Sequence, residues 1–262
     1  MRVEAVFFDV DYTLYDMAQY VRGALSNVAQ DVAATCSGNR ETLFASLWGK
    51  WREVGSAYEH LFDDWLRSHG LFAESRLRAC IDVYHAHRPA LSLYPGVDEL
   101  LVDLRSRYCV GVITDGNLQR QRAKVDALDL EEKVDLIVYS AALSSSKPDA
   151  GIFRHGLRLA GVAPERSVYV GDHPIRDIAG ARRAGMLGIR VLTGEFSHLP
   201  DDPELRPTYR VDDLWHLPQA LAKLETLDRG NAALSEIGIS PASPDRREDG
   251  DAGSRDGRRP CD

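Results

Sequence analysis

The residues that could do chemistry in this sequence begin with two carboxylates and a hydroxyl near its N-terminus. Asp9, Asp11 and Thr13 follow Val3–Phe8, a short apolar run that is rich in β-branched and aromatic residues and predicts a buried central strand. Ligands of an open parallel sheet bind at the carboxyl ends of its strands. The spacing therefore predicts that both carboxylates face one side, where they could share a metal ion or a reacting group. The alternative is a turn in which Asp and Thr side chains only cap backbone groups.

A second group of polar residues follows the predicted strand Cys109–Thr114. Thr114 ends that strand, and Asp115, Gly116 and Asn117 open the next helix. A hydroxyl beside the free N–H groups of a helix N-terminus forms an anion site. We therefore predict phosphate binding here, with simple capping of the helix by Asp115 or Asn117 as the alternative.

Two more motifs place charged residues after later strands. Lys147 stands directly before Pro148, and Asp172 and Asp177 follow the predicted strand Ser167–Val170. A lysine offers a compact positive charge, and two carboxylates in this arrangement suit a hard cation with a supporting second group. The alternatives are a surface lysine and a helix cap at Asp177.

The elements that must position these residues follow from the hydrophobic pattern. Residues 17–88 carry apolar side chains at helical spacing, which predicts a bundle inserted after the first strand. From residue 97 onward, predicted strands alternate with single helices, which implies a parallel sheet with right-handed crossovers. We therefore predict an α/β fold in which residues 1–16 and 89–228 form the core, 17–88 form a helical cap, and 229–262 form a disordered tail.

The core elements are predicted from apolar runs for strands and from helical periodicity with glycine stops for helices. The predicted strands are Val3–Phe8, Cys109–Thr114, Val134–Tyr139, Ser167–Val170, Leu187–Leu192 and Tyr209–Val211. The predicted helices are Val97–Arg107, Asn117–Leu128, Asp149–Ala160, Pro174–Ala184 and Leu214–Leu227.

Composition narrows the classes of partner. A net charge of -8 and a pI near 5.5 argue against nucleic acid or an anionic membrane as the main partner. The four cysteines form no CxxC pair, which disfavours a zinc site or a disulfide framework. No apolar run reaches membrane-spanning length. The N-terminus opens with the charged residues Arg2 and Glu4 and goes directly into the first predicted strand, so we expect no signal peptide here. We expect a cytoplasmic protein.

The motifs, in chain order, are Asp-x-Asp-x-Thr, a strand-end Thr, Lys-Pro, and Gly-Asp followed by a further Asp. With these motifs, the sequence from about Val3 to Leu227 resembles the haloacid dehalogenase-like (HAD) superfamily, specifically its phosphatases with a small helical cap. The resemblance implies a Rossmann-like parallel sheet core. The segments TDGNLQRQRAKVDAL and SSSKPDAGIF are most similar to the subgroup that contains pyrimidine nucleotidases and N-acylneuraminate-9-phosphatase.

This resemblance implies a Mg2+-dependent phosphomonoester hydrolase that acts on a nucleotide or sugar phosphate through an aspartyl-phosphate. Asp9 would be the nucleophile, and Asp11 would protonate the leaving alkoxide and then activate water. Mg2+ would bind Asp9, the backbone carbonyl of Asp11, and Asp172, with Asp177 supporting the site. The remaining phosphoryl oxygens would be held by Thr114, Asp115, Gly116, Asn117 and Lys147. Because one carboxylate must be ionised and the other protonated, we expect neighbouring negative charge to raise one pKa.

Two features bear on substrate choice. Tyr12 stands where many relatives have Gly or Asp, and we expect its ring to narrow the leaving-group side or to pack beneath the cap. His85, His87 and Arg88 precede the return to the core and could face the site from the cap. The alternative for these three residues is a solvated helix end or a hinge.

Other reactions remain open within the same superfamily. A sugar phosphomutase shares the core residues, and a phosphonatase would need Lys50 as a Schiff-base lysine in the cap. The carboxylate at Asp11 counts against both a dehalogenase and a protein that only binds phosphate without turnover. We expect a small-molecule phosphomonoester as the partner, no nucleic acid or membrane, and a monomer or homodimer.

Overall fold

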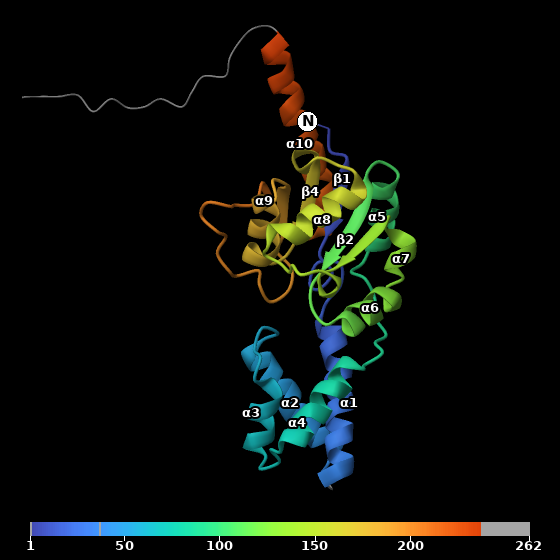
Figure 1. The fold of residues 1–262 in the computed structure, drawn as a ribbon, viewed down its shortest axis with the longest axis vertical. Coiled ribbons are helices and arrows are strands. Elements are labelled where there is room, and N and C mark those ends of the chain that lie inside the picture. The colour runs from blue at the N-terminus through green and yellow to red at the C-terminus, as the bar shows by residue number, and fades with distance from the viewer. Residues whose placement is uncertain (1, 37, 237–262) are drawn as a thin grey trace, which may run out of the picture.

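The protein consists of an α/β core with a group of helices at one end (Figure 1). The computed structural model describes residues 2–36 and 38–236. Its single sheet has six parallel strands in the order β3-β2-β1-β4-β5-β6. The strands are β1 (Ala5–Phe8), β2 (Cys109–Thr114), β3 (Leu136–Tyr139), β4 (Ser167–Gly171), β5 (Leu187–Val191) and β6 (Tyr209–Val211). This sheet confirms the predicted parallel α/β fold.

Strand β1 lies at the centre of the sheet, and all four of its residues are buried. Phe8 is in register with Val112 of β2 and Val170 of β4. The backbone N–H of Asp9 then donates to the carbonyl oxygen of Val170 at 2.9 Å. The chains that leave β1, β2 and β4 therefore start from one edge of the sheet, which brings their polar residues together.

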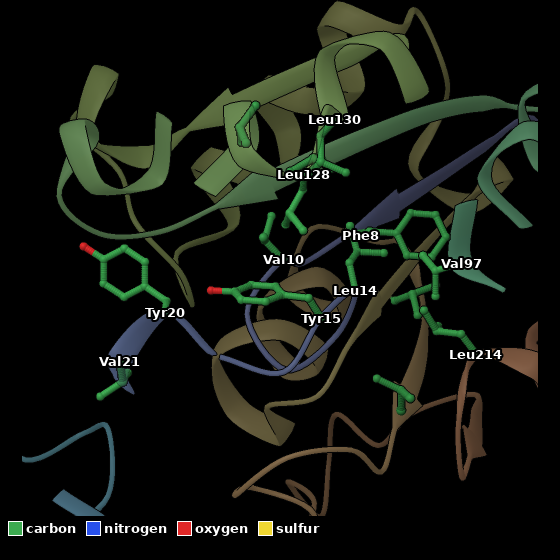
Figure 2. Close-up of a cluster of buried hydrophobic side chains, with 14 of the residues drawn as sticks. Phe8, Val10, Leu14, Tyr15, Tyr20, Val21, Val97, Leu128, Leu130 and Leu214 are labelled. Atoms are coloured by element: carbon green, nitrogen blue, oxygen red, sulfur yellow. The ribbon is translucent and has the colours of Figure 1, made fainter. Parts of the chain in front are cut away.

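The two faces of the sheet are covered by different helices. Val6 and Phe8 belong to one cluster of buried side chains, with residues of α5 and α10, and Figure 2 shows Phe8 beside Val97. Ala5 and Phe7 belong to the other cluster, with residues of α8 and α9. Because successive side chains of a strand point to opposite faces, a strand that is apolar throughout needs this cover on both sides.

The helices of the core lie between successive strands, except for the last one, which follows β6. They are α5 (Val97–Arg105), α6 (Leu118–Ala127), α7 (Leu130–Lys133), α8 (Ala150–Ala160), α9 (Gly180–Arg183) and α10 (Leu217–Glu236). Short 3-10 turns are η1 (Ser140–Ala142), η2 (Pro164–Arg166) and η4 (Leu214–His216).

The predicted helix at Pro174–Ala184 forms in two parts of different helix type. A π-helical turn, η3 (Pro174–Ala179), comes first, and α9 follows it. The N–H of Ile178 bonds to the carbonyl of His173 at 3.2 Å, which is the wider i to i+5 spacing. Gly171 permits the close approach of this turn, because a Cβ there would lie 2.6 Å from the Cβ of Asp177. Packing against β4 therefore decides the local geometry, which the helical periodicity could not reveal.

Four helices precede the return of the chain to the core. They are α1 (Ala18–Cys36), α2 (Arg40–Val54), α3 (Leu61–Ser68) and α4 (Glu74–His85). Their buried stripes include Leu25, Leu47 and Trp65, which are fully or almost fully buried. These helices lie inside the range 17–88 that was expected to form the cap, and Figure 1 shows them as the blue to teal group apart from the sheet.

The C-terminal boundary differs from the expected one. Helix α10 continues to Glu236, so residues 229–236 are helical and do not belong to the expected tail. The one glycine in this part of the helix, Gly230, costs about 1 kcal/mol, and the good helix formers Ala and Leu follow it. The rest of the expected tail, 237–262, lies outside the described residues. Within the described part, none of the helices has both the length and the apolar character required to span a membrane.

Candidate active site

A cavity of about 510 Å³ lies between the strand ends of the sheet and helices α2, α3 and α4. Its wall brings together most of the residues that the motifs predicted, namely Asp9, Asp11, His85, Asp115, Gly116, Lys147, Asp172 and Asp177. The predicted residues that do not line this cavity are Thr114, Asn117, His87 and Arg88. The motifs of four separate strand ends therefore meet in one place.

Lys147 joins two carboxylates at the floor of this cavity. Its Nζ donates to Asp9 Oδ1 and, at 2.8 Å, to Asp177 Oδ1, and its side chain is only 2% exposed. Burial alone would lower the pKa of Lys147, but Asp177 and Asp9 raise it well above its ordinary value. Burial likewise opposes ionisation of Asp177, yet Lys147 holds the pKa of that carboxyl below its usual range. Lys147 is therefore a fixed positive charge beside Asp9.

Asp177 has further bonds that hold it in place. Its Oδ2 accepts the backbone N–H of His173 at 3.0 Å, and its Oδ1 accepts the Tyr169 hydroxyl at 3.4 Å. With Lys147 included, both carboxylate oxygens have protein partners. This arrangement suits the supporting role that the resemblance implies for Asp177.

Three buried carboxylates could hold a cation. Asp9, Asp172 and Asp177 each offer an oxygen within 4.8 Å of the others. Asp172 Oδ2 is buried and has no hydrogen-bond partner among the described residues. Burial raises the pKa of Asp9 to about 7 and that of Asp172 well above its ordinary value. A buried set of oxygen donors with too little positive charge around it fits a hard cation such as Mg2+.

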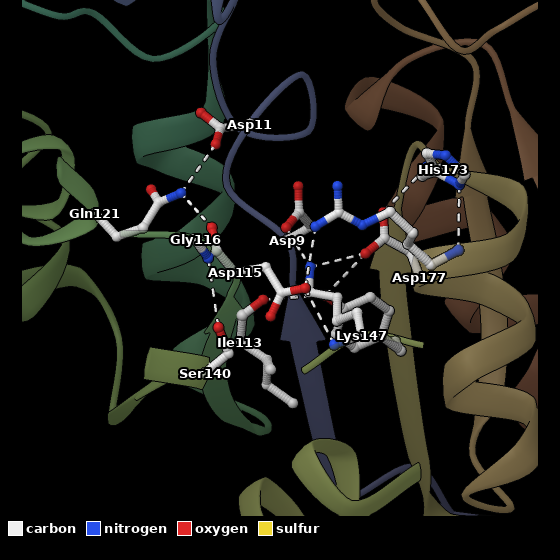
Figure 3. Close-up of polar contacts among 12 residues, drawn as sticks. Asp9, Asp11, Ile113, Asp115, Gly116, Gln121, Ser140, Lys147, His173 and Asp177 are labelled. Carbon is white, nitrogen blue, oxygen red and sulfur yellow. Dashed lines mark hydrogen bonds and ion pairs between the residues drawn. The ribbon is translucent and has the colours of Figure 1, made fainter. Parts of the chain in front are cut away.

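Asp11 has different neighbours from Asp9. Lys124 Nζ donates to its two oxygens at 2.6 and 2.7 Å, and the Tyr15 hydroxyl donates at 2.6 Å. Figure 3 shows Asp11 turned toward Gln121, whose Nε2 lies 3.3 Å away, whereas Asp9 lies beside Lys147. Burial would raise the pKa of Asp11, but Lys124 lowers it below the ordinary value. The rise in pKa that the sequence predicted for one carboxylate therefore occurs at Asp9 and not at Asp11.

Lys124 was missed by the sequence analysis. It is completely buried, which is rare for a lysine without a charged partner. It follows Gln121 by three residues on α6, so both side chains lie on one face of the helix that begins after the Thr114 motif. That spacing, directly after a strand-end motif, was the available signal.

The loop after β2 uses its polar groups in several ways. Asp115 Oδ2 accepts the backbone N–H of Lys147 at 3.0 Å and Arg176 Nη2 at 3.0 Å. The Asn117 side chain accepts the N–H of Arg120 at 3.1 Å and so caps α6, as the capping alternative predicted. Thr114 ends β2 as a buried residue. The Asp115 carboxylate therefore orders this loop against the Lys147 segment.

Tyr12 lies in the cavity wall where the cap contacts the core. Its φ is 58°, a left-handed conformation that favours glycine, and its ring packs closely against Gly194. Its hydroxyl donates to Glu195 at 3.4 Å, and Glu195 also accepts the N–H of Ser56 in the cap at 3.1 Å. Tyr12 and Phe196 stack edge to face with ring centroids 6.1 Å apart.

Of the residues considered for substrate choice, some line the cavity and others do not. His85 lines the cavity, and burial lowers its pKa. His87 points to helix α1, where its Nδ1 lies 3.0 Å from Asn27 Nδ2, and Arg88 is exposed. Lys50 does not line the cavity, so its position gives no support to a Schiff-base mechanism.

Comparison with known proteins identifies the family. Residues 6–191 match the family model described as haloacid dehalogenase-like hydrolase. Similar curated proteins include glyceraldehyde 3-phosphate phosphatase of Methanopyrus kandleri, which is 32% identical over 84% of this chain and 99% of its own. Phosphoserine phosphatase of Thermus thermophilus is 34% identical over 62% of this chain and 64% of its own. N-acylneuraminate-9-phosphatase of Rattus norvegicus is 28% identical over 86% and 96%.

Solved structures support the same fold. A HAD phosphatase from Thermococcus onnurineus has a TM-score of 0.58 and 21% identity over 84% of this chain and 98% of its own. A 2-haloacid dehalogenase from Pseudomonas syringae has a TM-score of 0.59 and 27% identity over 84% and 99%. The curated relatives named above are phosphatases, which confirms the expected enzyme class. The chain therefore belongs to the haloacid dehalogenase-like hydrolases, as its motifs predicted.

Proposed function

We propose that this protein is a Mg2+-dependent phosphomonoester hydrolase that acts on a small phosphorylated metabolite through an aspartyl-phosphate at Asp9. The observation that carries the proposal is the meeting of Asp9, Lys147 and Asp172 with Asp11 in one cavity. We further propose that 1–16 and 89–228 act as the catalytic core and that 17–88 act as the cap over it.

Asp9 is the nucleophile in this proposal. One of its carboxylate oxygens attacks phosphorus, and the bond from phosphorus to the leaving alkoxide breaks. Lys147, already bonded to Asp9, would also face the phosphoryl group and offset its negative charge. Water then attacks the aspartyl-phosphate, releases phosphate and restores the carboxylate.

Mg2+ fits beside the nucleophile. Asp9, Asp172 and the backbone carbonyl of Asp11 would hold it, with Asp177 bracing Lys147 and the His173 backbone behind them. When bound, it would supply the positive charge that the buried carboxylates lack and that a phosphate dianion needs.

Asp11 is the acid and base of the two steps. It would give a proton to the leaving alkoxide and later take one from water. Lys124 and Tyr15 orient its carboxylate but favour the ionised form. A phosphate dianion in the cavity would raise the pKa of Asp11 in opposition to Lys124, so substrate binding favours the protonated form that the first step needs.

The substrate is proposed to be a small phosphomonoester. The names of the relatives cite glyceraldehyde 3-phosphate, phosphoserine and N-acylneuraminate, which differ in their alcohol part. The cavity of about 510 Å³ has room for a compound of this size beside the phosphoryl site.

The test is release of phosphate from an aryl phosphate. We expect turnover with Mg2+ and none with excess chelator, and we expect Asp9→Asn to abolish turnover while circular dichroism shows a normal fold. Full activity of that variant would disprove the mechanism. If the protein isomerises a sugar phosphate faster than it hydrolyses it, the activity is that of a phosphomutase and not of a hydrolase.

A further inference from the structure

We infer that Arg120 recognises a carboxylate on the leaving group, so that the preferred substrate is a phosphorylated carboxylic acid. This inference rests on the proposed function, because it concerns the alcohol part of the phosphomonoester.

Arg120 lies between the core and the cap on the side of Asp11. It stands in the first turn of α6 and lines the same cavity as Asp11. A Cβ at Gly116 would lie 2.8 Å from Arg120 Nη2, so the guanidinium packs on the loop after β2. Its Cζ lies 6.0 Å from the ring centroid of Tyr84 in cap helix α4. Because Asp11 would protonate the leaving oxygen, Arg120 faces the part of the substrate that departs.

Arg120 forms no ion pair with the carboxylates whose side chains the structure describes. Within residues 2–36 and 38–226, it has no carboxylate oxygen within 4.0 Å, and its buried Nε lacks a hydrogen-bond partner. The neighbouring cations are matched, since Lys124 pairs with Asp11 at 2.6 Å and Arg176 pairs with Asp115 at 3.0 Å. A buried donor on a charged group without a partner is costly. A ligand anion in the cavity would supply the missing counter-charge to the guanidinium.

The cap offers no suitable anion of its own. Glu59 is the one acid that the described cap residues contribute to the cavity wall, and it is exposed and forms no ion pair with Arg120. The other cap residues nearby are largely apolar or aromatic, such as Phe62, Ile81 and Tyr84. A guanidinium in apolar surroundings binds a carboxylate through two parallel hydrogen bonds.

A carboxylate fits better than a second phosphate. Lys124 is already neutralised by Asp11, so Arg120 is a single spare positive charge on this side. One cation balances the single charge of a carboxylate, whereas a second phosphate would carry about -2. The predicted substrate class is therefore a short phosphorylated acid.

Matched substrate pairs test this inference. 3-Phosphoglycerate and glyceraldehyde 3-phosphate differ by a carboxylate in place of an aldehyde, and phosphoserine and phosphoethanolamine differ by the presence of a carboxylate. We expect kcat/KM to favour the acid about tenfold or more in both pairs, because a charged hydrogen-bond pair is at stake. Arg120→Gln should remove this preference, mainly through a higher KM for the acids, and Arg120→Lys should restore part of it.

Arg122→Gln is the control. Arg122 lies on the same helix but outside the cavity wall, with its Cζ 5.9 Å from the Tyr139 ring centroid. The variant changes the net charge by the same amount as Arg120→Gln without changing the cavity. We expect its preference to match that of the wild type. If Arg120→Gln lowers kcat/KM equally for acid and neutral substrates, or if the wild type does not prefer the acids, the inference is wrong. Hydrolysis of an aryl phosphate would still support the proposed function in that case.

Binding separates the inference from turnover. Calorimetry on the Asp9→Asn protein should give tighter binding of 3-phosphoglycerate than of glyceraldehyde 3-phosphate, and Arg120→Gln in that background should remove the difference. Equal dissociation constants would contradict the inference even if no ester were hydrolysed. If Arg120→Gln weakens binding of glucose 1,6-bisphosphate more than binding of the acids, Arg120 recognises a second phosphate and the inference of a carboxylate is refuted.

Discussion

Asp9 and Asp11, the two proposed catalytic carboxylates, are two residues apart in the chain but lie in opposite electrostatic surroundings. The Asp9 side consists of Asp9, Lys147, Asp172 and Asp177, with three carboxylates and one lysine. The Asp11 side consists of Asp11, Tyr15, Arg120 and Lys124, with one carboxylate and two cations. Burial dominates on the Asp9 side and raises the pKa of Asp9, while Lys124 overcomes burial on the other side and lowers the pKa of Asp11.

Each side therefore suits a different requirement of the proposed reaction. The Asp9 side is short of positive charge, which favours binding of a divalent cation, and the bound cation would in turn attract the phosphoryl group. The Asp11 side has positive charge to spare, which is the condition for receiving an anionic leaving group. The same residue type therefore serves two roles because the neighbours of each copy differ.

The largest expected effect is the loss of activity in Asp9→Asn. The amide cannot form an acyl-phosphate, so kcat should fall by about 10^4-fold or more, in the range seen when a nucleophile is removed. The same change relieves the burial of a carboxylate that is short of positive charge. We expect the melting temperature of the metal-free protein to be equal to or higher than that of the wild type. A clear drop in metal-free stability would contradict the electrostatic picture of the Asp9 side.

Asp11→Asn should affect activity and stability together. Loss of the acid and base should lower kcat by about 10^2- to 10^4-fold. Unlike Asp9→Asn, this variant leaves Lys124 buried without a charged partner, which should destabilise the protein by about 3 kcal/mol. Denaturant unfolding measures the loss, and Lys124→Met in the Asp11→Asn background should recover part of it. If both asparagine variants change stability in the same direction, the contrast between the two sides is wrong.

Much of the scaffold could be predicted from the sequence because the strands are buried on both faces. The ranges of β2 and β6 match the predicted ones, and β1 is shorter than Val3–Phe8 by two residues. A continuous apolar run indicates such a strand without any knowledge of its neighbours. Once the sheet is parallel, Asp9, Lys147 and Asp172 must approach one edge, so the Asp9 side follows from topology.

The Asp11 side could not be derived in the same way. Lys124 is 113 residues from Asp11 in the chain, and its partner depends on the rotation of α6 about its axis. His85 and His87 show the same limit, since His85 ends α4 and lines the cavity, whereas His87, two residues later, points to α1. The direction of each pKa shift depends on burial and on these contacts, which periodicity does not encode.

A smaller effect concerns the pH dependence of stability on the Asp9 side. Its pKa is raised in the folded protein from 3.8 to about 7, so the folded state binds a proton there that the unfolded state does not. Stability from this group is present at low pH and is lost as pH rises from about 4 to about 7. His85, His87 and His173 have lowered pKa values and act in the opposite direction as pH falls, but they are common to wild type and variant.

The difference between Asp9→Asn and wild type therefore reports Asp9 together with its effect on the pKa of the neighbouring Asp172. In chelator, the melting temperature of Asp9→Asn minus that of wild type should be positive at pH 8 and should shrink toward pH 5. Each kcal/mol corresponds to about 2–4 °C for a domain of this size, so the shift is measurable by calorimetry. Saturating Mg2+ should reduce the difference at pH 8 or reverse it, because the cation stabilises the ionised carboxylate of the wild type. A difference that is independent of pH would exclude a raised pKa at Asp9.

The smallest effect expected is that of Tyr15→Phe on the pH profile. The Tyr15 hydroxyl donates to Asp11 at 2.6 Å and helps to lower the pKa of that carboxyl, behind the larger contribution of Lys124. Its removal should raise the pKa of Asp11. Asp11 must be protonated to act as the acid, so its deprotonation gives the alkaline limb of the pH profile of kcat/KM. This limb should therefore move to higher pH in the variant. Tyr169→Phe is the matched control, since that hydroxyl bonds to Asp177 at 3.4 Å and should leave this limb in place. A shift in both variants would show that the two sides are not electrostatically separate.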